Sequence, residues 1–548
     1  MISNKMLKFI IKLFAFLSIL ISILILLTAA YLIYIPIDLS NYKGYLIDKI
    51  EKETTVSVSV EKIVLKILPN PRILLEGFEV KADADTIFSS KTIRMNLHLV
   101  PLLKREINIK RIIMDSPLLR VKRDRTGTIN IAGFFGNNKI KAEIDDVWVT
   151  NGRVWFIDEF VGDKVFYTMG NVNLYLKPDY NKRIVYEIKG SLHDDTSESA
   201  MIDSAGVIKD YDKEDFLIDG KITANNINLH NYQPYLKTVL KDTGLNANMN
   251  ISAGYSLKGW LKSIETNGKI DYSMIRLDMP SIFSKKILST RGSFDIGLKY
   301  DDAAFLINIK NGLFHLPEFT ISATGSGVKS KGEEAFDVAL DVKTSPIPLP
   351  VIKGYIPSNI LPAPIYQNLK KADPAKGSIT IDRLVYSSKK PDDFLLKMAF
   401  KDAGFSFAGF KKTWTDIEGS LAIKRETLVF ENVRGKYGKS SIERLMGNIK
   451  DFEKKPVFDL KTAITLDVKD AMDELKQRDF GRTWAKTFGE LKEINGFAAL
   501  TLEASGSTQE KGQLSYFGTA SLKDVNLFHK DLAFPLNDIT GVLNFDNQ

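Results

Sequence analysis

The chain has 548 residues, of which 44% are hydrophobic and 26% charged, and its formal net charge is +8. At roughly 150 residues per domain this length predicts three or four folded units, and the composition is typical of globular rather than disordered protein. The positive balance is weak and partly comes from Lys5, Lys8 and Lys12, so it does not favour nucleic acid as a partner. The sequence has no cysteine, which excludes disulfides, thiolate catalysis and cysteine metal sites.

An uncharged apolar run from Leu13 to Ile35 is long enough to cross a hydrocarbon core of roughly 30 Å as a helix. It is longer than the apolar core of a cleaved signal peptide, about 7–15 residues, and it ends at Tyr34 and Pro36 with interfacial character. We therefore expect an uncleaved single-pass anchor. Because the lysines precede the run, the positive-inside rule predicts a cytoplasmic N-terminus, with residues 37–548 outside, in the periplasm of a bacterium.

After the anchor, Leu39–Glu53 carries apolar residues at helical spacing, and beyond it the pattern changes to alternation. Strict alternation occurs in several short segments, among them 55–60, 107–109, 119–121, 171–176 and 464–468. Pairs such as Asn151-Gly152 and Asn311-Gly312 predict turns between strands. Many short alternating strands predict a mostly antiparallel sheet with two unlike faces. Further short helices are expected at 232–241, 364–371 and 471–491.

The C-terminal part contains an internal repeat. Segments that begin at Lys401 and Asp416 recur 122 residues further along, at Lys523 and Asp538. The alternative is a chance match between two strand–turn–strand patterns. If the repeat is real, each unit is a group of strands with one short helix. The last unit is expected to be incomplete, because the strand corresponding to 427–433 is missing after residues 534–545.

Residues 1–130 and 350–548 resemble the AsmA-like family, which includes the TamB and YhdP proteins. In the first region the resemblance rests on the membrane helix, the amphipathic helix and the segments 56–66, 71–80, 99–103, 107–112, 115–121 and 124–130. In the second region it rests on residues 414–447. The family is similar to bridge-like lipid transfer proteins, whose repeating β-groove units form a long trough.

The resemblance implies an inner-membrane-anchored periplasmic protein that transports phospholipid between inner and outer membranes or takes part in outer-membrane biogenesis. The expected fold is mainly β, with the transmembrane helix followed by an elongated, twisted antiparallel β-sheet groove and short connecting helices. The expected divisions are a cytoplasmic tip and anchor at 1–36, an AsmA-like N-terminal domain at 37–135, middle β-groove units at 136–350, and a C-terminal repeat region at 351–548.

An apolar sheet face would form a slot for acyl chains, since burying each CH₂ is worth about 0.8 kcal/mol. The groove candidates, chosen because they share strand faces, are Val56, Val58, Val60, Ile107, Ile109, Leu174 and Leu176. Basic residues gather between Lys104 and Arg125, and Arg120, Lys122 and Arg123 are candidates for contact with anionic headgroups. The alternative for these cations is an ordinary solvated sheet face.

The sequence shows no constellation typical of an enzyme. Its five histidines are scattered without an HExxH pair, so no metal site is expected. Gly438-Lys439-Ser440 ends like a phosphate-binding loop, but Val433 stands where the first glycine is required, which favours a plain turn. Adjacent carboxylates such as Asp145-Asp146 lie among polar residues and are interpreted as solvated loops.

We therefore expect no enzymatic activity and no cofactor. The expected partners are membrane phospholipids and the inner membrane, with other envelope proteins as a further option and no nucleic acid. The competing hypothesis is a non-conducting envelope scaffold or assembly factor that binds protein partners by its sheet edges.

Overall fold

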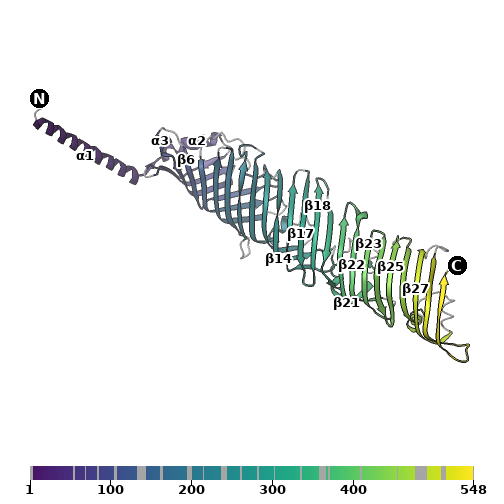
Figure 1. The fold of residues 1–548 in the computed structure, drawn as a ribbon. Helices are drawn as coiled ribbons and strands as arrows, with labels where there is room; N and C mark the ends of the chain where they lie inside the picture. Colours follow the sequence, from purple (N-terminus) through teal and green to yellow (C-terminus); the bar gives the residue numbers. More distant parts are fainter. Residues whose placement is uncertain are drawn as a thin grey trace. The chain divides into compact units, whose positions relative to one another are not determined.

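The computed structural model describes residues 4–53, 56–67, 70–82, 85–103, 108–131, 144–160, 165–179, 181–193, 200–213, 215–235, 244–259, 262–280, 283–301, 303–333, 336–356, 366–367, 371–407, 410–452, 454–475, 490–507 and 514–546. Over these residues the fold is mainly β, as the alternating pattern predicted, and 29 strands form one hydrogen-bonded sheet (Figure 1). Two compact units divide the chain. The first comprises Met1–Lys241, Asn248–Gly268 and Lys299–Asp302, and the second comprises Asp242–Ala247, Lys269–Leu298 and Ala303–Gln548.

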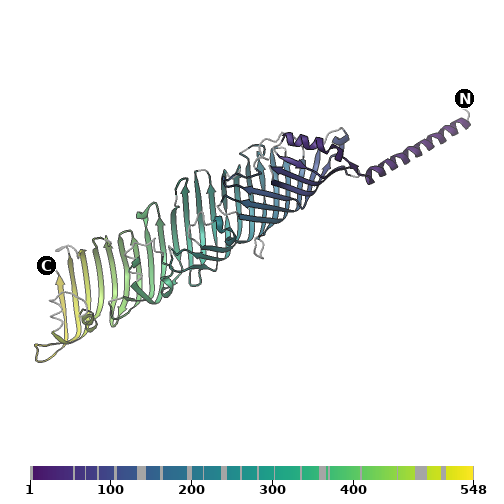
Figure 2. The same ribbon diagram turned by 180° about the vertical axis from the view of Figure 1, so that it is seen from behind.

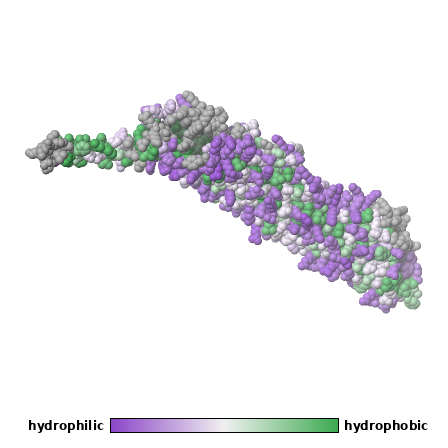
Figure 3. Space-filling model, turned by 45° about the horizontal axis from the view of Figure 1, so that its top comes forward, coloured by the Kyte–Doolittle hydropathy of each residue, from purple (hydrophilic) through white to green (hydrophobic). Residues whose placement is uncertain are grey.

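The anchor predicted from the sequence is helix α1 (Asn4–Tyr34). Its stretch Ile11–Tyr31 has a mean hydropathy of 2.8 and is not buried against the rest of the described protein. In the space-filling view its placed residues are mostly hydrophobic (Figure 3). A helix that is apolar on all sides and packs against nothing is stable only in an apolar solvent. It is therefore a candidate membrane span.

The first unit begins with the predicted amphipathic segment, a turn of 3₁₀ helix η1 (Ser40–Tyr42) and helix α2 (Lys43–Glu53), which lies beside the first strands (Figure 2). Strand β1 (Ile37–Asp38) precedes η1, and the elements after α2 are β2 (Ser57–Ser59), β3 (Lys62–Lys66), β4 (Arg72–Ala82), β5 (Asp85–Leu97), helix α3 (Leu99–Leu103), β6 (Ile109–Asp115) and β7 (Leu118–Arg123). They are followed by β8 (Ile144–Asp158), β9 (Val165–Asp179), β10 (Arg183–His193), β11 (Ala200–Lys209), β12 (Leu217–Asn228) and the 3₁₀ helix η3 (Leu229–Tyr232). Strands β13 (Gly244–Lys258) and β14 (Ser263–Asp278) are shared between the two units.

Pairing within this unit is antiparallel with one exception. β1 pairs with β3, β3 with β4, β4 with β5, and each strand from β8 to β13 with the next. β6 and β7 lie end to end between β5 and β8, antiparallel to β5 and parallel to β8. Ser116 joins the two with a positive φ of 51°, followed by Pro117.

The second unit holds β15 (Ile287–Ser289), β16 (Arg291–Tyr300), β17 (Ala304–His315), β18 (Thr320–Ser330), β19 (Asp337–Thr344), β20 (Ile347–Pro348), helix α5 (Leu349–Ile352), β21 (Ala372–Ser387), the 3₁₀ helix η4 (Pro391–Asp393) and β22 (Leu395–Phe407). It continues with β23 (Trp414–Lys424), β24 (Thr427–Tyr437), β25 (Ser440–Lys450), β26 (Val457–Asp467), helix α7 (Val468–Leu475), β27 (Leu491–Ser507), β28 (Ser515–His529) and β29 (Leu536–Asp546). From β21 to β29 every strand pairs antiparallel with the next.

The turns predicted at Asn151-Gly152 and Asn311-Gly312 are wrong. Both pairs lie inside long strands, β8 and β17, where the strand register shifts. Asn151 has a φ of 54° and Asn311 a φ of 49°, the left-handed conformation that asparagine tolerates. One extra residue in that conformation makes a bulge and lets the strand continue.

The 122-residue repeat is present in the backbone of the second unit. Asp402 and Asp524 have φ values of 49° and 51°, and Asp416 and Asp538 have φ values of 52° and 54°. The β22–β23 pairing shifts register after Phe400, and the β28–β29 pairing shifts at the equivalent Leu522. Two strand pairs therefore carry the same bulges at the same offset, which chance matching of turn residues does not explain.

The predicted short helices agree in part. Helix η3 and the helical residues 233–235 begin the segment expected at 232–241, whose remainder lies outside the described residues. Most of the segment expected at 364–371 also lies outside them. Helix α7 starts at Val468, and β27 begins at Leu491, where that helix was expected to end.

Candidate functional site

In the first unit the sheet has one apolar and one polar face. Paired residues of neighbouring strands point to the same side, so the register traces each face from strand to strand. One row runs from Val149 through Leu174, Ile188, Ser204 and Ile222 to Ala253. On the opposite side lie Glu187, Lys189, Asp203, Lys221 and Thr223, with an ion pair of 2.9 Å between the Lys189 ammonium and the Asp203 carboxylate.

The apolar face of this unit carries the groove candidates Leu174 and Leu176, and both are half-buried. Leu176 starts a second row that passes through Tyr186, Gly206 and Gly220 to Tyr255. The two glycines make room for the tyrosine rings, since a Cβ at Gly220 would lie 2.3 Å from the Tyr186 hydroxyl. The two tyrosine hydroxyls hydrogen-bond to each other, and the Tyr255 hydroxyl lies 2.8 Å from Ser204 Oγ. Tyrosine side chains therefore occupy the space over the two glycines in the middle of the face.

A short helical segment, 229–235, crosses the same apolar face nearer its other edge. The Tyr167 ring on β9 stacks on Tyr232 with centroids 5.3 Å apart, and its hydroxyl donates a 2.8 Å hydrogen bond to the carbonyl of Asn231. The Tyr235 hydroxyl donates a 2.7 Å hydrogen bond to Asp158, whose residue is only 1% exposed. Burial, together with the charges of Tyr232 and Asp158, raises the pKa of Tyr167 to about 12.

The valine candidates lie where the sheet face is covered by packed side chains. Val58 and Val60 are each 5% exposed and pack in one cluster with Ile63 and Val80, against which Val56 also packs. These three valines are therefore part of a packed core. Ile109 is half-buried at the start of β6, opposite Leu97 and Ile144, and Ile107 lies outside the described residues.

The second unit also has two unlike faces. One row runs from Ile464 through Leu500 and Ala520 to Leu543, and another joins Leu460, Ala504 and Tyr516. Leu460, Ile464 and Leu500 are half-buried. The opposite side carries Lys461 and Glu503, paired at 2.9 Å, and the hydroxyls of Thr501 and Thr519, 2.6 Å apart. In Figure 3 hydrophobic patches lie between hydrophilic residues over the body.

Part of this apolar face is covered. Ile347 of β20 and Leu349, the first residue of α5, are 3% and 1% exposed and pack with Ile379, Leu396 and Met398 of the sheet. The face is therefore a closed core around β21–β23. Over β26–β28 its aliphatic side chains stay half-exposed.

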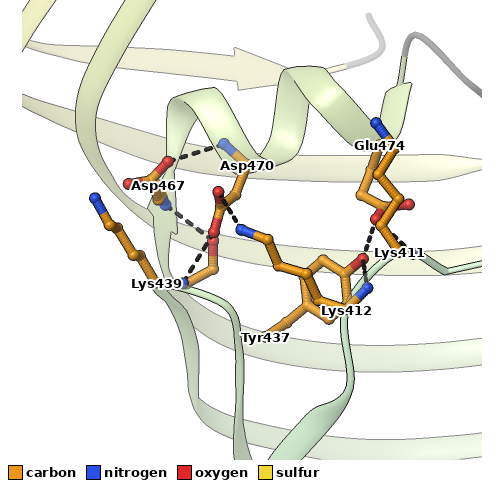
Figure 4. A network of polar contacts seen from close by, with 8 residues as sticks. Lys411, Lys412, Tyr437, Lys439, Asp467, Asp470 and Glu474 are labelled. Carbon is orange, nitrogen blue, oxygen red and sulfur yellow. Dashed lines mark hydrogen bonds and ion pairs between the residues drawn. The ribbon is translucent and has the colours of Figure 1, made fainter. Parts of the chain in front are cut away.

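A polar clasp holds α7 against the turn between β24 and β25 (Figure 4). The Asp470 carboxylate accepts from the Lys412 ammonium at 2.5 Å and from the backbone N–H of Lys439 at 2.9 Å. Burial raises the pKa of Asp470, but the hydrogen bonds from Lys412 and Lys439 outweigh it and hold the pKa below its usual range. The Tyr437 hydroxyl donates to Glu474. Gly438-Lys439 is the β24–β25 turn, as predicted, and its φ of 60° at Gly438 suits glycine.

The three cations proposed for headgroup contact lie on both sides of the sheet. Arg120 and Lys122 point to the polar face, and the Arg120 guanidinium stacks on Trp155 at 4.9 Å. Lys122 pairs with Glu159 at 3.3 Å. Arg123 points to the apolar side, where Nη1 lies 3.8 Å from Asp158 and the guanidinium stacks on Phe160 at 4.0 Å.

Among the described residues, no group of three or more histidine, aspartate or glutamate side chains could hold a metal ion. His98 lies 3.0 Å from Asp145, the carboxylate that the sequence placed in a solvated loop, and Asp146 is bound by Arg111 at 2.6 and 2.8 Å. Both carboxylates lie on β8, and each contacts a different side chain, His98 or Arg111, so they are not paired with each other. The solvated-loop interpretation of this pair is wrong, because β8 begins at Ile144.

Residues 219–548 match the family model described as YhdP protein, and residues 10–230 match the model described as AsmA family. The chain belongs to the AsmA-like family. Its members are envelope proteins, and an apolar N-terminal helix followed by a long two-faced sheet fits a membrane-anchored member. Among the curated proteins, no sequence matches this AsmA-like protein.

Proposed function

We propose that this AsmA-like protein is anchored in the inner membrane by α1 and binds phospholipid acyl chains along its apolar sheet face in the periplasm. It would serve phospholipid transport between inner and outer membranes or outer-membrane biogenesis. The supporting observation is that aliphatic side chains paired across neighbouring strands stay half-exposed, neither fully solvated nor packed away: Leu174, Ile188 and Ile222 in one unit, and Ile464 and Leu500 in the other.

Aliphatic side chains that stay half-exposed raise the free energy of the protein in water. Each CH₂ of a lipid chain laid on them recovers about 0.8 kcal/mol, and the lysine, glutamate and threonine side chains of the other face keep the sheet soluble. The tyrosine–glycine row of the first unit offers flat rings and hydroxyls within the same face. An acyl chain fits such a surface better than a polar ligand does.

The test measures lipid and stability together in the full chain. Leu174→Asp and Leu500→Asp each place a carboxylate on the apolar face at a half-exposed position. The matched controls are Ala205→Asp, opposite Lys221 on the polar face, and Thr501→Asp. We expect both leucine variants to lose most co-purified phospholipid, measured by mass spectrometry, while melting near the wild-type temperature; both controls should keep it.

Unchanged lipid in Leu174→Asp and Leu500→Asp would contradict the proposal. It would instead support the non-conducting scaffold, which binds protein partners by its sheet edges. Val58→Asp shows what a core substitution does. Val58 is 5% exposed in the packed core, so a carboxylate there should unfold the unit, and any loss of lipid should accompany a loss of stability.

A further inference from the structure

The polar face of the first unit carries a cluster of aromatic and basic side chains that the proposed lipid path does not use. The outer patch, as we name it, consists of Arg111, Arg120, Lys122, Arg153, Trp148, Trp155, Phe166 and Tyr175. Trp148 is 39% exposed and Phe166 is 54% exposed, although both lie on the side of the sheet that is otherwise polar. Exposed aromatic residues on a polar face require an explanation.

The patch is built by the register of β6, β7, β8 and β9. Arg120 pairs with Trp155 and Trp155 with Thr168, while Lys122 pairs with Ile157 and Ile157 with Phe166. All of these residues therefore point to one side. The rings contact one another, with Trp155 and Phe166 edge to face at 5.9 Å and Trp148 and Tyr175 at 4.7 Å.

Each tryptophan is covered by one arginine. The Arg111 guanidinium lies 5.3 Å from the Trp148 ring, and the Arg120 guanidinium lies 4.9 Å from the Trp155 ring. Arg111 is neutralised by Asp146, and Lys122 by Glu159. Arg120 and Arg153 form no ion pair among the described residues, and Arg120 Nε is buried without a hydrogen-bond partner there. The patch therefore has an excess of positive charge.

Tryptophan and tyrosine beside arginine and lysine are the side chains typical of the membrane–water interface, where rings enter the headgroup layer and cations meet anionic lipid. The outer patch and the candidate membrane span α1 belong to the same unit. Anchoring by α1 would therefore keep the patch near a bilayer surface. Only the two residues Ile35 and Pro36 separate α1 from β1. At about 4.8 Å per strand, β8 lies roughly 24 Å across the sheet from β1, the distance of five strand spacings.

We propose that the outer patch docks the first unit onto the surface of the membrane that anchors it, through anionic phospholipid headgroups. The docking uses the face opposite to the proposed acyl-chain face and does not depend on lipid transport. Of the three cations singled out from the sequence, Arg120 would bind headgroups and Lys122 would assist, whereas Arg123 is engaged with Asp158 on the other side. This surface would fix which side of the sheet faces the bilayer.

The absence of cysteine allows a direct test with the full chain. A single cysteine at the exposed Thr150, on the same face, carries an environment-sensitive fluorophore, and a cysteine at the exposed Thr223 on β12 is the matched control. Each protein is reconstituted in vesicles of phosphatidylglycerol and phosphatidylethanolamine, or of phosphatidylcholine alone, with headgroup-quencher lipid. We expect strong quenching at 150 in anionic vesicles and little at 223 or in phosphatidylcholine.

Substitution of arginines in the outer patch tests whether quenching depends on their charge or only on the nearness of the unit to the bilayer. Arg120→Gln with Arg153→Gln should weaken docking by about fivefold per charge and reduce quenching at 150. The charge-matched control, Lys189→Gln with Lys221→Gln, lies on the same face away from the rings and should leave quenching unchanged. Equal quenching at 150 and 223, or quenching that ignores both anionic lipid and the arginine substitutions, would overturn the proposal. Circular dichroism of each variant confirms that the sheet is intact.

Discussion

Asp158 is a buried carboxylate on a face that otherwise carries aliphatic and aromatic residues. Its Oδ2 accepts from the Tyr235 hydroxyl at 2.7 Å, its Oδ1 accepts from the backbone N–H of Phe160 at 2.9 Å, and Arg123 supplies the positive charge. A buried charge is tolerated only when it is paired and hydrogen-bonded in this way. The three partners come from β7, from the residues just after β8 and from the segment 229–235, so Asp158 ties that segment to the sheet.

We expect Tyr235→Phe to lower the free energy of unfolding by about 1.5–3 kcal/mol, because it removes a hydrogen bond to a charged group. Urea unfolding of the full chain measures it. The control is Tyr211→Phe, at a tyrosine that is 41% exposed and outside this network. In a double-mutant cycle, Tyr235→Phe should lower the free energy of unfolding much less when Asp158→Asn is already present. Additive losses would show that the two side chains are not coupled.

The face of each candidate residue was the least predictable property of the sequence. Alternation correctly predicted strands and a two-faced sheet, and it placed Arg120 and Lys122 opposite Leu119 and Val121. It could not show that Arg123, one residue further, meets a buried aspartate 35 positions away in β8. Such a contact depends on the parallel β7–β8 pairing, for which the sequence carries no local signal.

At the scale of elements, bulges decide which side chains lie on the apolar face of the sheet. A bulge inserts one residue and inverts the alternation beyond it, so faces cannot be counted through a long strand from sequence alone. In β8 the apolar side passes from Val147 and Val149 to Gly152 and Val154 across Asn151. The turn predicted at Asn151-Gly152 was wrong because the same residues serve hairpin turns and bulges, and only strand pairing distinguishes the two.

Asn151 has a φ of 54°, which a β-branched side chain adopts only with strain. We expect Asn151→Val to destabilise the first unit by about 1–2 kcal/mol, whereas Asn151→Gly, which suits the left-handed conformation, should be nearly neutral. Thermal unfolding of the two variants provides the comparison. Equal loss in both would mean that the side-chain hydrogen bonds of Asn151, not its backbone conformation, matter at this bulge.

Helix α7 is held by charge, so its attachment should depend on pH. The pKa of Asp470 is lowered in the fold, so its contribution is present above the ordinary pKa of 3.8 and is lost as pH falls through the lower folded value. We expect wild-type protein to lose more stability than Asp470→Asn between pH 5 and 2. Thermal unfolding across that range, with the exposed Asp531→Asn as control, measures the difference; parallel curves would argue against the clasp.

For the whole molecule, the sequence predicted the class of fold and the family correctly. Both rest on the membrane-span pattern and on alternation repeated over many strands, and neither depends on the pairing register of any one strand. The side of the membrane on which the sheet lies stays a prediction, made from Lys5, Lys8 and Lys12 preceding the span. We expect an alkaline phosphatase fusion after residue 130 to be active and a cytoplasmic reporter at the same site to be silent. The reverse pattern would remove the periplasmic location on which the proposed function depends.

Pairing in the sheet is almost entirely between strands that are neighbours along the chain, from β8 to β13 and again from β21 to β29. Contacts of this kind have low contact order, and each new strand needs only the one before it as a template. A chain with this pairing can therefore fold strand by strand from its N-terminal end, in the order in which it is synthesised. The same order holds where β6 and β7 share the place between β5 and β8, because both strands pair with β5 and both precede β8 along the chain.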